Sequence, residues 1–199
     1  MTYRSSSELL TLHAVRLLGY ADTSKVAVRF DLPLEVAEEQ LLDAQAVGRI
    51  SYTTFGGEGG WSMTEAGRTW GERQLGAELD QAGARAIVDR THQEFRPYNI
   101  TVSELCTAWQ LVELEVGDAG ADLGSIVTGL SSAATALAGF ESALTARLSR
   151  FAGYHRRFAD ALDRIDADPS WITATDRDSC HRIWFEFHED LIATLGLTR

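Results

Sequence analysis

Apolar residues near the start of the chain recur at the three- and four-residue spacing of an amphipathic helix. This pattern runs from Leu9 to Leu18. Ser5 and Glu8 stand before it at the spacing of a capping box, in which two side chains satisfy exposed backbone N–H groups. Gly19 follows, and glycine commonly ends a helix. The pattern therefore predicts a first helix that ends at Gly19.

Two further helical patterns follow within the first 48 residues. Asp22 or Thr23 can cap a short helix that runs to about Phe30. Pro33 suits the first turn of a third helix that runs to about Val47, and Gly48 can cap its end.

The pattern then changes from helical to alternating. Residues 49–53 alternate and are rich in β-branched side chains, which indicates a strand. Residues 55–60 include four glycines and predict a flexible hairpin tip. Residues 61–63 form a short returning strand, and Thr64 can cap the helix after it.

The rest of the chain predicts helices without strands. One helix is expected from Leu75 to about residue 98, where Pro97 and Asn99 mark its end. Another follows the capping-box match at Thr101 and Glu104.

Interruptions divide the remaining helical patterns. A loop is expected over residues 117–122, and a helix rich in small residues over 126–140. Residues 166–170 break the pattern, and the Thr175-x-x-Asp178 spacing can cap a last helix.

A regular 4-3-4-3 spacing lies between these interruptions, at Leu144, Leu148, Phe151, His155, Phe158, Leu162 and Ile165. This spacing predicts one continuous helix with a seam of three heptads. The seam fits the core helix of a bundle. Alternatively, it fits a dimerisation helix in which His155 meets its symmetry mate or a carboxylate.

The order of three helices, a glycine-tipped hairpin and a further helix is that of a winged helix-turn-helix. The string AVGRISYTTFGGEGGWSMTEAGRTW resembles the wing of the multiple-antibiotic-resistance repressor (MarR) superfamily, whose LTxxGR-like motif corresponds to residues 63–68. The string SCHRIWFEFHEDLIATLGL resembles the end of actinobacterial MarR-like proteins. The resemblance covers about residues 7–75. It implies a mainly α fold, with a winged helix-turn-helix over residues 1–75 and an all-helical bundle over 76–199.

The resemblance also implies a function. MarR-like proteins are transcriptional regulators that bind operator DNA as homodimers, with the third helix in the major groove. The residues expected to contact double-stranded DNA are Lys25, Arg29, Gln40, Arg49, Ser51 and Arg68. The helical region is expected to form the homodimer and to bind a small aromatic or lipophilic effector through Phe95, Arg96, Tyr98 and Trp109.

The distribution of charge opposes this function. The chain has a net charge of −11, and the expected third helix carries Glu35, Glu38, Glu39 and Asp43 without lysine or arginine. Carboxylates repel phosphates, whose neutralisation by cations supplies most of the affinity for DNA. The alternative function is a winged helix that binds another protein and not DNA. Related winged-helix segments also resemble those fused to phosphotransfer enzymes of the dikinase type.

Composition and motifs narrow the remaining classes. A hydrophobic content of 45% with 24% charged residues is typical of a globular protein. No run approaches about 18 consecutive apolar residues, and the start of the chain lacks a signal-peptide pattern. The two distant cysteines favour a reducing compartment. We therefore expect a cytoplasmic protein with no membrane segment.

The sequence lacks a phosphate-binding loop, a dinucleotide fingerprint, a nucleophile elbow and a zinc-protease motif. We therefore expect no enzymatic activity and no cofactor. The best metal candidate is Cys180, His181, His188 and Glu189. Its two histidines would lie about 10.5 Å apart along a helix, so no metal site is expected.

Overall fold

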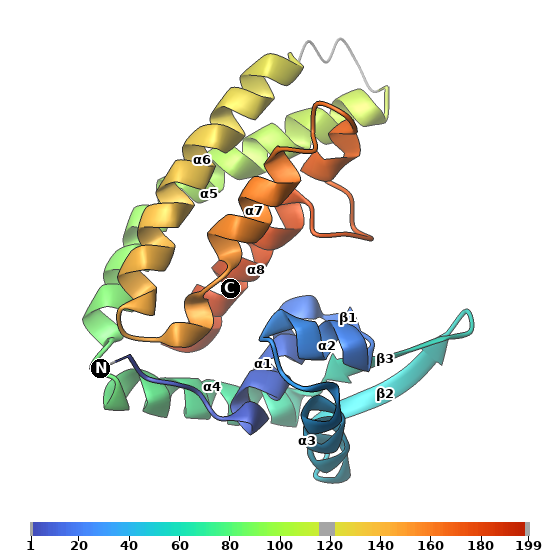
Figure 1. Cartoon of the computed structure of the whole chain (residues 1–199), viewed down its shortest axis with the longest axis vertical. Helices are drawn as coiled ribbons and strands as arrows, with labels where there is room; N and C mark the ends of the chain where they lie inside the picture. Colours follow the sequence, from blue (N-terminus) through green and yellow to red (C-terminus); the bar gives the residue numbers. More distant parts are fainter. Residues whose placement is uncertain (1, 116–121, 198–199) are drawn as a thin grey trace. The chain divides into compact units, whose positions relative to one another are not determined.

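The computed structural model describes residues 2–115 and 122–197 of the chain. The fold is mainly helical, with a small three-stranded antiparallel sheet (Figure 1). It divides into two compact units, and the expected boundary after residue 75 falls inside a helix of the first. The first unit comprises residues 1–85, 147–150 and 189–199, and the second comprises 86–146 and 151–188.

The first unit contains the three expected helices and a hairpin, which are confirmed. The strands of the hairpin are longer than expected, because residues 58–60 pair with residues 53–55 and leave only Gly56 and Gly57 in the turn. Side chains of Ser6, Asp22 and Thr64 accept hydrogen bonds from backbone N–H groups at three helix starts. The elements are α1 (Ser7–Leu18), β1 (Tyr20–Ala21), α2 (Thr23–Arg29), α3 (Leu34–Ala46), β2 (Ile50–Phe55), β3 (Glu58–Met63) and α4 (Glu65–Gln81).

The sheet has the order β1-β3-β2. β2 and β3 form a hairpin in which Tyr52 stands opposite Trp61, and β1 pairs with the other edge of β3, with Tyr20 opposite Ser62. The sequence predicted the hairpin but not β1, because a strand of two residues carries no periodic signal.

The core of the first unit joins α1, α2, α3 and the sheet, through buried Leu12, Val15, Val26, Leu41, Ile50 and Trp61. Ala37, Leu41 and Ala44 lie at helical spacing on α3, and all three face inward, since they are buried. Gly67 lies in the first turn of α4, where a Cβ would collide with the carbonyl oxygen of Arg49. Glycine at this position therefore lets α4 begin close to the start of β2.

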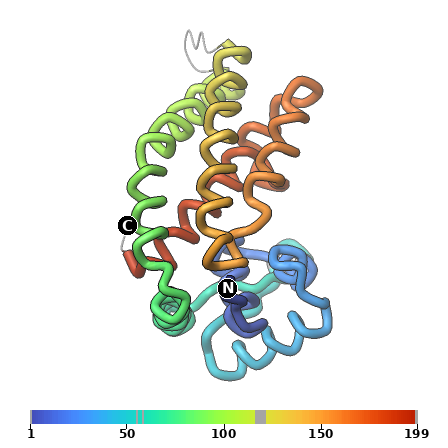
Figure 2. The backbone as a smooth tube through the Cα atoms, turned by 60° about the vertical axis from the view of Figure 1, so that its left-hand side comes forward, coloured from blue at the N-terminus to red at the C-terminus, as the bar shows by residue number. Residues whose placement is uncertain are grey.

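The second unit is an antiparallel arrangement of helices. In its two longest helices, α5 (Arg85–Glu113) and α6 (Leu123–Thr145), Phe95 and Tyr98 contact Phe140, whereas Leu105 lies against Gly129. α6 therefore runs antiparallel to α5 (Figure 2). The elements are α5 (Arg85–Glu113), α6 (Leu123–Thr145), α7 (Tyr154–Leu162), the 3₁₀ turn η2 (Pro169–Ile172) and residues 180–188 of α8 (Cys180–Leu195). A further 3₁₀ turn, η1 (Ser149–Phe151), lies between α6 and α7, and the end of α8 belongs to the first unit.

The single helix expected from Leu75 to about residue 98 is wrong. Gly83 has a φ of 57°, outside the helical range, and separates α4 from α5. Pro97 lies inside α5 rather than at its end, and Thr101 donates a side-chain hydrogen bond to the Pro97 carbonyl oxygen instead of capping a helix. Proline removes one backbone hydrogen bond, but burial of the residues on the inner face of α5 outweighs that loss.

The continuous heptad helix is also wrong. α6 ends at Thr145, and α7 begins only after Gly153, whose φ is 95°. The carboxylate of Glu141 holds the intervening turn by accepting hydrogen bonds from the backbone N–H groups of Gly153 and His155, at 3.0 and 2.7 Å. The buried position at the start of α7 belongs to Tyr154, and His155 is only partly buried.

Two capping predictions need correction. Ser6 caps α1, whereas Ser5 donates a hydrogen bond to the carboxylate of Glu78. At the start of α8, Ser179 rather than Thr175 accepts a hydrogen bond from a first-turn N–H group.

The predicted break over residues 166–170 is confirmed, because α7 ends at Leu162. The loop expected over residues 117–122 lies outside the described residues, except for Asp122, which caps α6.

Among the described residues, α6 is long and apolar enough to cross a membrane, judged by length and composition alone. Within its most apolar window, 33% of the residues are buried in the fold. The sequence analysis predicts this helix over residues 126–140, and the serines and threonines in it keep any run of consecutive apolar residues well below about 18.

Candidate functional site

The exposed face of α3 consists of two parallel rows of side chains, each at the four-residue spacing that forms ridges on a helix. The two rows include all four carboxylates of α3, and every member is exposed. The first row is Leu34, Glu38, Leu42 and Ala46, and the second is Glu35, Glu39, Asp43 and the adjoining Val47. Figure 1 shows α3 at the edge of the first unit. We call these eight residues the α3 face.

The α3 face combines unpaired negative charge with exposed apolar surface. Within the described residues, none of its four carboxylates forms an ion pair. Leu34, Leu42 and Val47 are 47%, 54% and 61% exposed. A surface with this composition repels phosphate and favours a partner that supplies both cations and apolar side chains.

Arg49 and Arg29, the two arginines expected to contact DNA next to α3, are held by other protein groups. Arg49 donates a hydrogen bond to Glu8 at 2.7 Å, and its guanidinium lies over the ring of Trp70 at 3.9 Å from the centroid. Arg29 lies over the ring of Phe30 at 4.5 Å and is partly buried. Both arginines therefore have a structural role in the first unit.

The other residues expected to contact DNA are scattered over different environments. Lys25 is 62% exposed in its side chain, with Asp22 at 3.5 Å, and Arg68 lies 3.7 Å from Glu65. The Ser51 hydroxyl lies 3.2 Å from that of Ser62 inside the sheet. Gln40, on α3, is partly buried. Lys25, Gln40, Ser51 and Arg68 thus lie on four different elements, α2, α3, β2 and α4.

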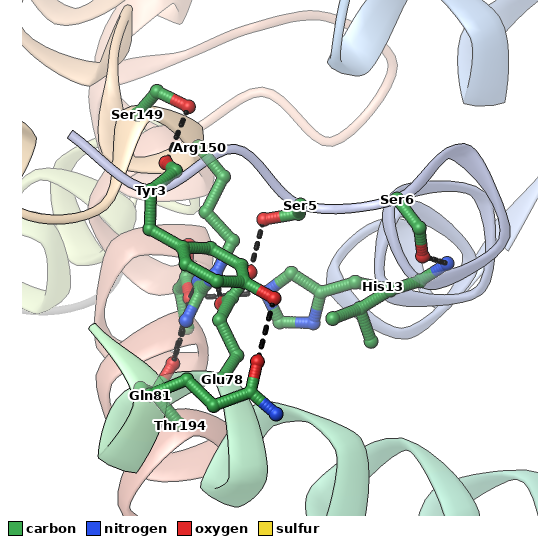
Figure 3. Close-up of polar contacts among 11 residues, drawn as sticks. Tyr3, Ser5, Ser6, His13, Glu78, Gln81, Ser149, Arg150 and Thr194 are labelled. Atoms are coloured by element: carbon green, nitrogen blue, oxygen red, sulfur yellow. Dashed lines mark hydrogen bonds and ion pairs between the residues drawn. The ribbon is translucent and has the colours of Figure 1, made fainter. Parts of the chain in front are cut away.

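Sequence reasoning missed a buried ion cluster in the first unit (Figure 3). Arg150 is at its centre. Its guanidinium donates hydrogen bonds to Asp190, to Glu78 at 2.8 Å and to the Thr194 hydroxyl at 2.6 Å. His13 lies with Nε2 at 2.9 Å from the carboxylate of Asp190. The cluster connects α1, α4, the turn at residue 150 and the end of α8.

Burial and mutual attraction set the protonation of this cluster. Burial alone would raise the pKa of Asp190, but Arg150 and His13 outweigh it and hold that pKa well below its usual range. Burial lowers the pKa of His13, and the attraction of Asp190 offsets this only in part. Neutral His13 therefore donates from Nε2 to Asp190, and its buried Nδ1 makes no hydrogen bond with the described residues.

A second set of ion pairs borders the cluster. Arg16 is buried and donates hydrogen bonds to Glu72 at 2.8 Å and to Glu189 at 2.9 Å. Arg68 approaches Glu189 at 4.0 Å. The buried arginines and carboxylates thus satisfy one another. This arrangement serves the packing of the unit.

A local signal for the cluster exists in the sequence. Glu78 falls between Leu75 and Leu79 on the buried side of α4, and Asp190 falls beside Leu191 on the buried side of α8. A charged residue in an apolar stripe indicates a buried partner, because an unpaired buried charge is very unfavourable. The partner itself is not predictable, since Arg150 lies 72 residues from Glu78.

The residues expected to bind an effector lie in the second unit, along α5. Phe95 is fully buried and packs against Trp184 at 4.8 Å between ring centroids. Tyr98 and Arg96 are exposed. Trp109 lies 14 residues after Phe95, or about 21 Å along the helix. Its indole N–H is buried without a hydrogen-bond partner among the described residues. One small ligand cannot contact both ends of this set.

The described residues contain no group of three or more histidine, cysteine or acidic side chains suited to hold a metal ion. His188 stacks on His92 with 6.4 Å between ring centroids. Cys106 and Cys180 are buried free thiols, and burial raises the pKa of each to about 12. A thiol with so high a pKa is a poor nucleophile at neutral pH.

Comparison with known proteins gives this chain no relative. No protein-family model, curated protein or solved structure matches it.

Proposed function

We propose that the first unit is a winged helix that binds another protein through the α3 face. The observation that carries this proposal is the lack of any cation on that face, where a DNA-reading winged helix needs positive charge. The element order α1-β1-α2-α3-β2-β3 supports the winged-helix assignment. The four unpaired carboxylates support a protein partner of positive charge.

The first test asks whether DNA binds at all. Genomic fragments are incubated with the full chain at low salt, where electrostatic binding is strongest, and bound fragments are sequenced. We expect no enriched sequence. Reproducible enrichment of one sequence, lost on raising the salt, would overturn the proposal.

The second test identifies the partner through the α3 face. The wild-type chain and a Glu35→Lys/Glu39→Lys variant are compared as baits, with Glu94→Lys/Glu104→Lys on α5 as the matched control. A specific partner should be retained by wild type and control and lost by the α3 variant. Purified partner must then bind the wild-type chain directly. A partner that binds all three equally would place the interaction elsewhere.

The second candidate function is a MarR-like transcriptional regulator that binds operator DNA as a homodimer under control of a small effector. The exposed positions of Lys25 and Arg68 favour it, because both side chains could reach phosphates. For this candidate, Lys25→Glu/Arg68→Glu should abolish DNA binding. Light scattering should also find a dimer at micromolar concentration, and a monomer would exclude two-fold operator binding.

A further inference from the structure

The inference concerns what kind of protein segment the α3 face accepts, and it rests on the proposed function. We infer that this face binds a basic amphipathic helix of the partner protein. Ridges at four-residue spacing define a groove between them, and such a groove accepts the matching ridge of a second helix. The row of Leu34 and Leu42 supplies apolar contact on one side, and the row of Glu35, Glu39 and Asp43 supplies charge on the other.

The partner's chemistry follows from the charges. A helix with leucine-like side chains at i, i+4 and i+7 can place them against Leu34 and Leu42. Lysine or arginine residues on its flanks can then reach the carboxylates of Glu35, Glu38, Glu39 and Asp43. An acidic or neutral helix would match the apolar row but would leave the four carboxylates unpaired.

Of the four charges of α3, only Glu35 is placed to stabilise the helix itself, because it lies in the first turn, where the helix dipole favours negative charge. Glu35, Glu39 and Asp43 are successive like charges at i, i+4, each pair costing about 0.2–0.5 kcal/mol. Asp43 also lies in the last turn, where the helix dipole disfavours negative charge and no basic residue balances it. A cationic partner offsets both repulsions, and this relief adds to the free energy of binding.

The size of the α3 face sets the affinity expected for the partner helix. α3 has 13 residues and is therefore about 20 Å long. A single helix laid across it buries less than the roughly 1,200 Å² that marks a standard stable interface. Binding should accordingly be transient, of roughly micromolar affinity, and should weaken as salt screens the ion pairs.

The test uses designed peptides, since the natural partner is unidentified. A fluorescein-labelled basic amphipathic peptide of about five turns, with leucines at i, i+4 and i+7, is titrated with the full chain. A second peptide has the same composition with its leucines moved around the helix so that no apolar stripe remains. A third keeps the stripe and replaces each lysine with glutamate. Binding is followed by fluorescence anisotropy at two salt concentrations.

We expect the first peptide to bind at least about tenfold more tightly than either of the others. Leu42→Ser should weaken its binding about tenfold, and Glu39→Lys/Asp43→Lys by more. Controls are Leu114→Ser, at a position that is 69% exposed in the second unit, and Glu94→Lys/Glu104→Lys on α5. Neither control should change the affinity. Circular dichroism spectra check that every variant is folded.

Four outcomes would overturn the inference. Equal binding of the first two peptides shows charge attraction without an apolar groove, and equal loss in the control variants places the peptide elsewhere. If no peptide binds, but Glu35→Lys/Glu39→Lys still removes a natural partner, the helix inference is wrong and the proposed function stands. If neither effect is seen, both are wrong.

Discussion

Two groups of charged side chains in the first unit are placed in opposite ways. In the buried cluster, Arg150, Glu78 and Asp190 are each less than 5% exposed and are joined by hydrogen bonds. On the α3 face, four carboxylates are exposed and form no ion pair with the described residues. The first group serves the fold, because removing any member takes a partner away from a buried charge. In the second, the helix dipole favours only Glu35, whereas the mutual repulsion of Glu35, Glu39 and Asp43 opposes the fold, which is the physical reason to propose a partner for it.

The largest expected effect tests the structural half of this comparison. Arg150→Met should lower the free energy of unfolding by about 3–5 kcal/mol, because it leaves the buried carboxylates of Glu78 and Asp190 without their cation. The control is Arg156→Met. Arg156 is 75% exposed and lies 3.9 Å from Asp160, so its loss should cost less than about 0.5 kcal/mol. Urea unfolding followed by circular dichroism measures both. Equal effects would show that the cluster is not structural.

The next effect is a dependence of stability on pH. The folded-state pKa of His13 is lowered, so the unfolded chain takes up a proton first as the pH falls below about 6.5. The stability from neutral His13 is therefore present above that pH and is lost below it. One such proton gives a slope of at most about 1.4 kcal/mol per pH unit. The lowered pKa of Asp190 acts in the same direction at still lower pH.

His13→Gln isolates this contribution, because glutamine can still donate to Asp190 but does not titrate. Urea unfolding at pH 8, 7, 6 and 5 should give wild type a steeper loss of stability than the variant below pH 6.5. His92 and His181 also have lowered pKa values and remain in both proteins, so they do not contribute to the difference. Identical slopes would contradict the buried, neutral state of His13.

The local parts of the fold were predictable from sequence, and the long-range parts were not. The cap at Asp22, the end of the third helix at Gly48 and the cap at Thr64 depend on neighbouring residues, and the structure confirms them. The break at Gly153 was missed because its neighbours keep a heptad spacing across the turn. Pro97 misled for the opposite reason, since burial along α5 overrides the local preference.

The candidate site was predictable in the same uneven way. The acidity of α3 is visible in the sequence, and the buried Ala37 and Leu41 follow the helical spacing of its apolar residues, with Glu35 on the exposed side. That Arg49 is bound by Glu8 and Trp70 required the structure, because these residues lie on different elements. From the sequence, Arg49 is a cation close to the third helix, whereas the structure shows that Glu8 and Trp70 already bind its guanidinium.

Arg49 is an intermediate case between the two groups and provides the third prediction. Its side chain is 24% exposed, with one ion pair to exposed Glu8 and one contact with Trp70. Arg49→Gln should therefore lower the free energy of unfolding by about 0.5–1.5 kcal/mol, less than Arg150→Met. Glu8→Gln provides the control, since it removes the ion pair and keeps the ring contact, and should cost less. Urea unfolding distinguishes them. If Arg49→Gln lowered the free energy of unfolding by less than Glu8→Gln, Arg49 would contribute little to the fold and would be available for binding.

The smallest effect tests the other half of the comparison and should have the opposite sign. Asp43→Asn removes a carboxylate from the last turn of α3, where the helix dipole and Glu39 both oppose it, so stability should rise by about 0.3–1 kcal/mol. Asp80, near the end of α4, is the matched residue, but it pairs with Arg85 at 2.8 Å. Asp80→Asn should therefore be neutral or slightly destabilising. Thermal unfolding of the two variants at low salt measures the difference. If Asp43→Asn were destabilising, the Asp43 carboxylate would stabilise the fold, and its presence on α3 would need no partner to explain it.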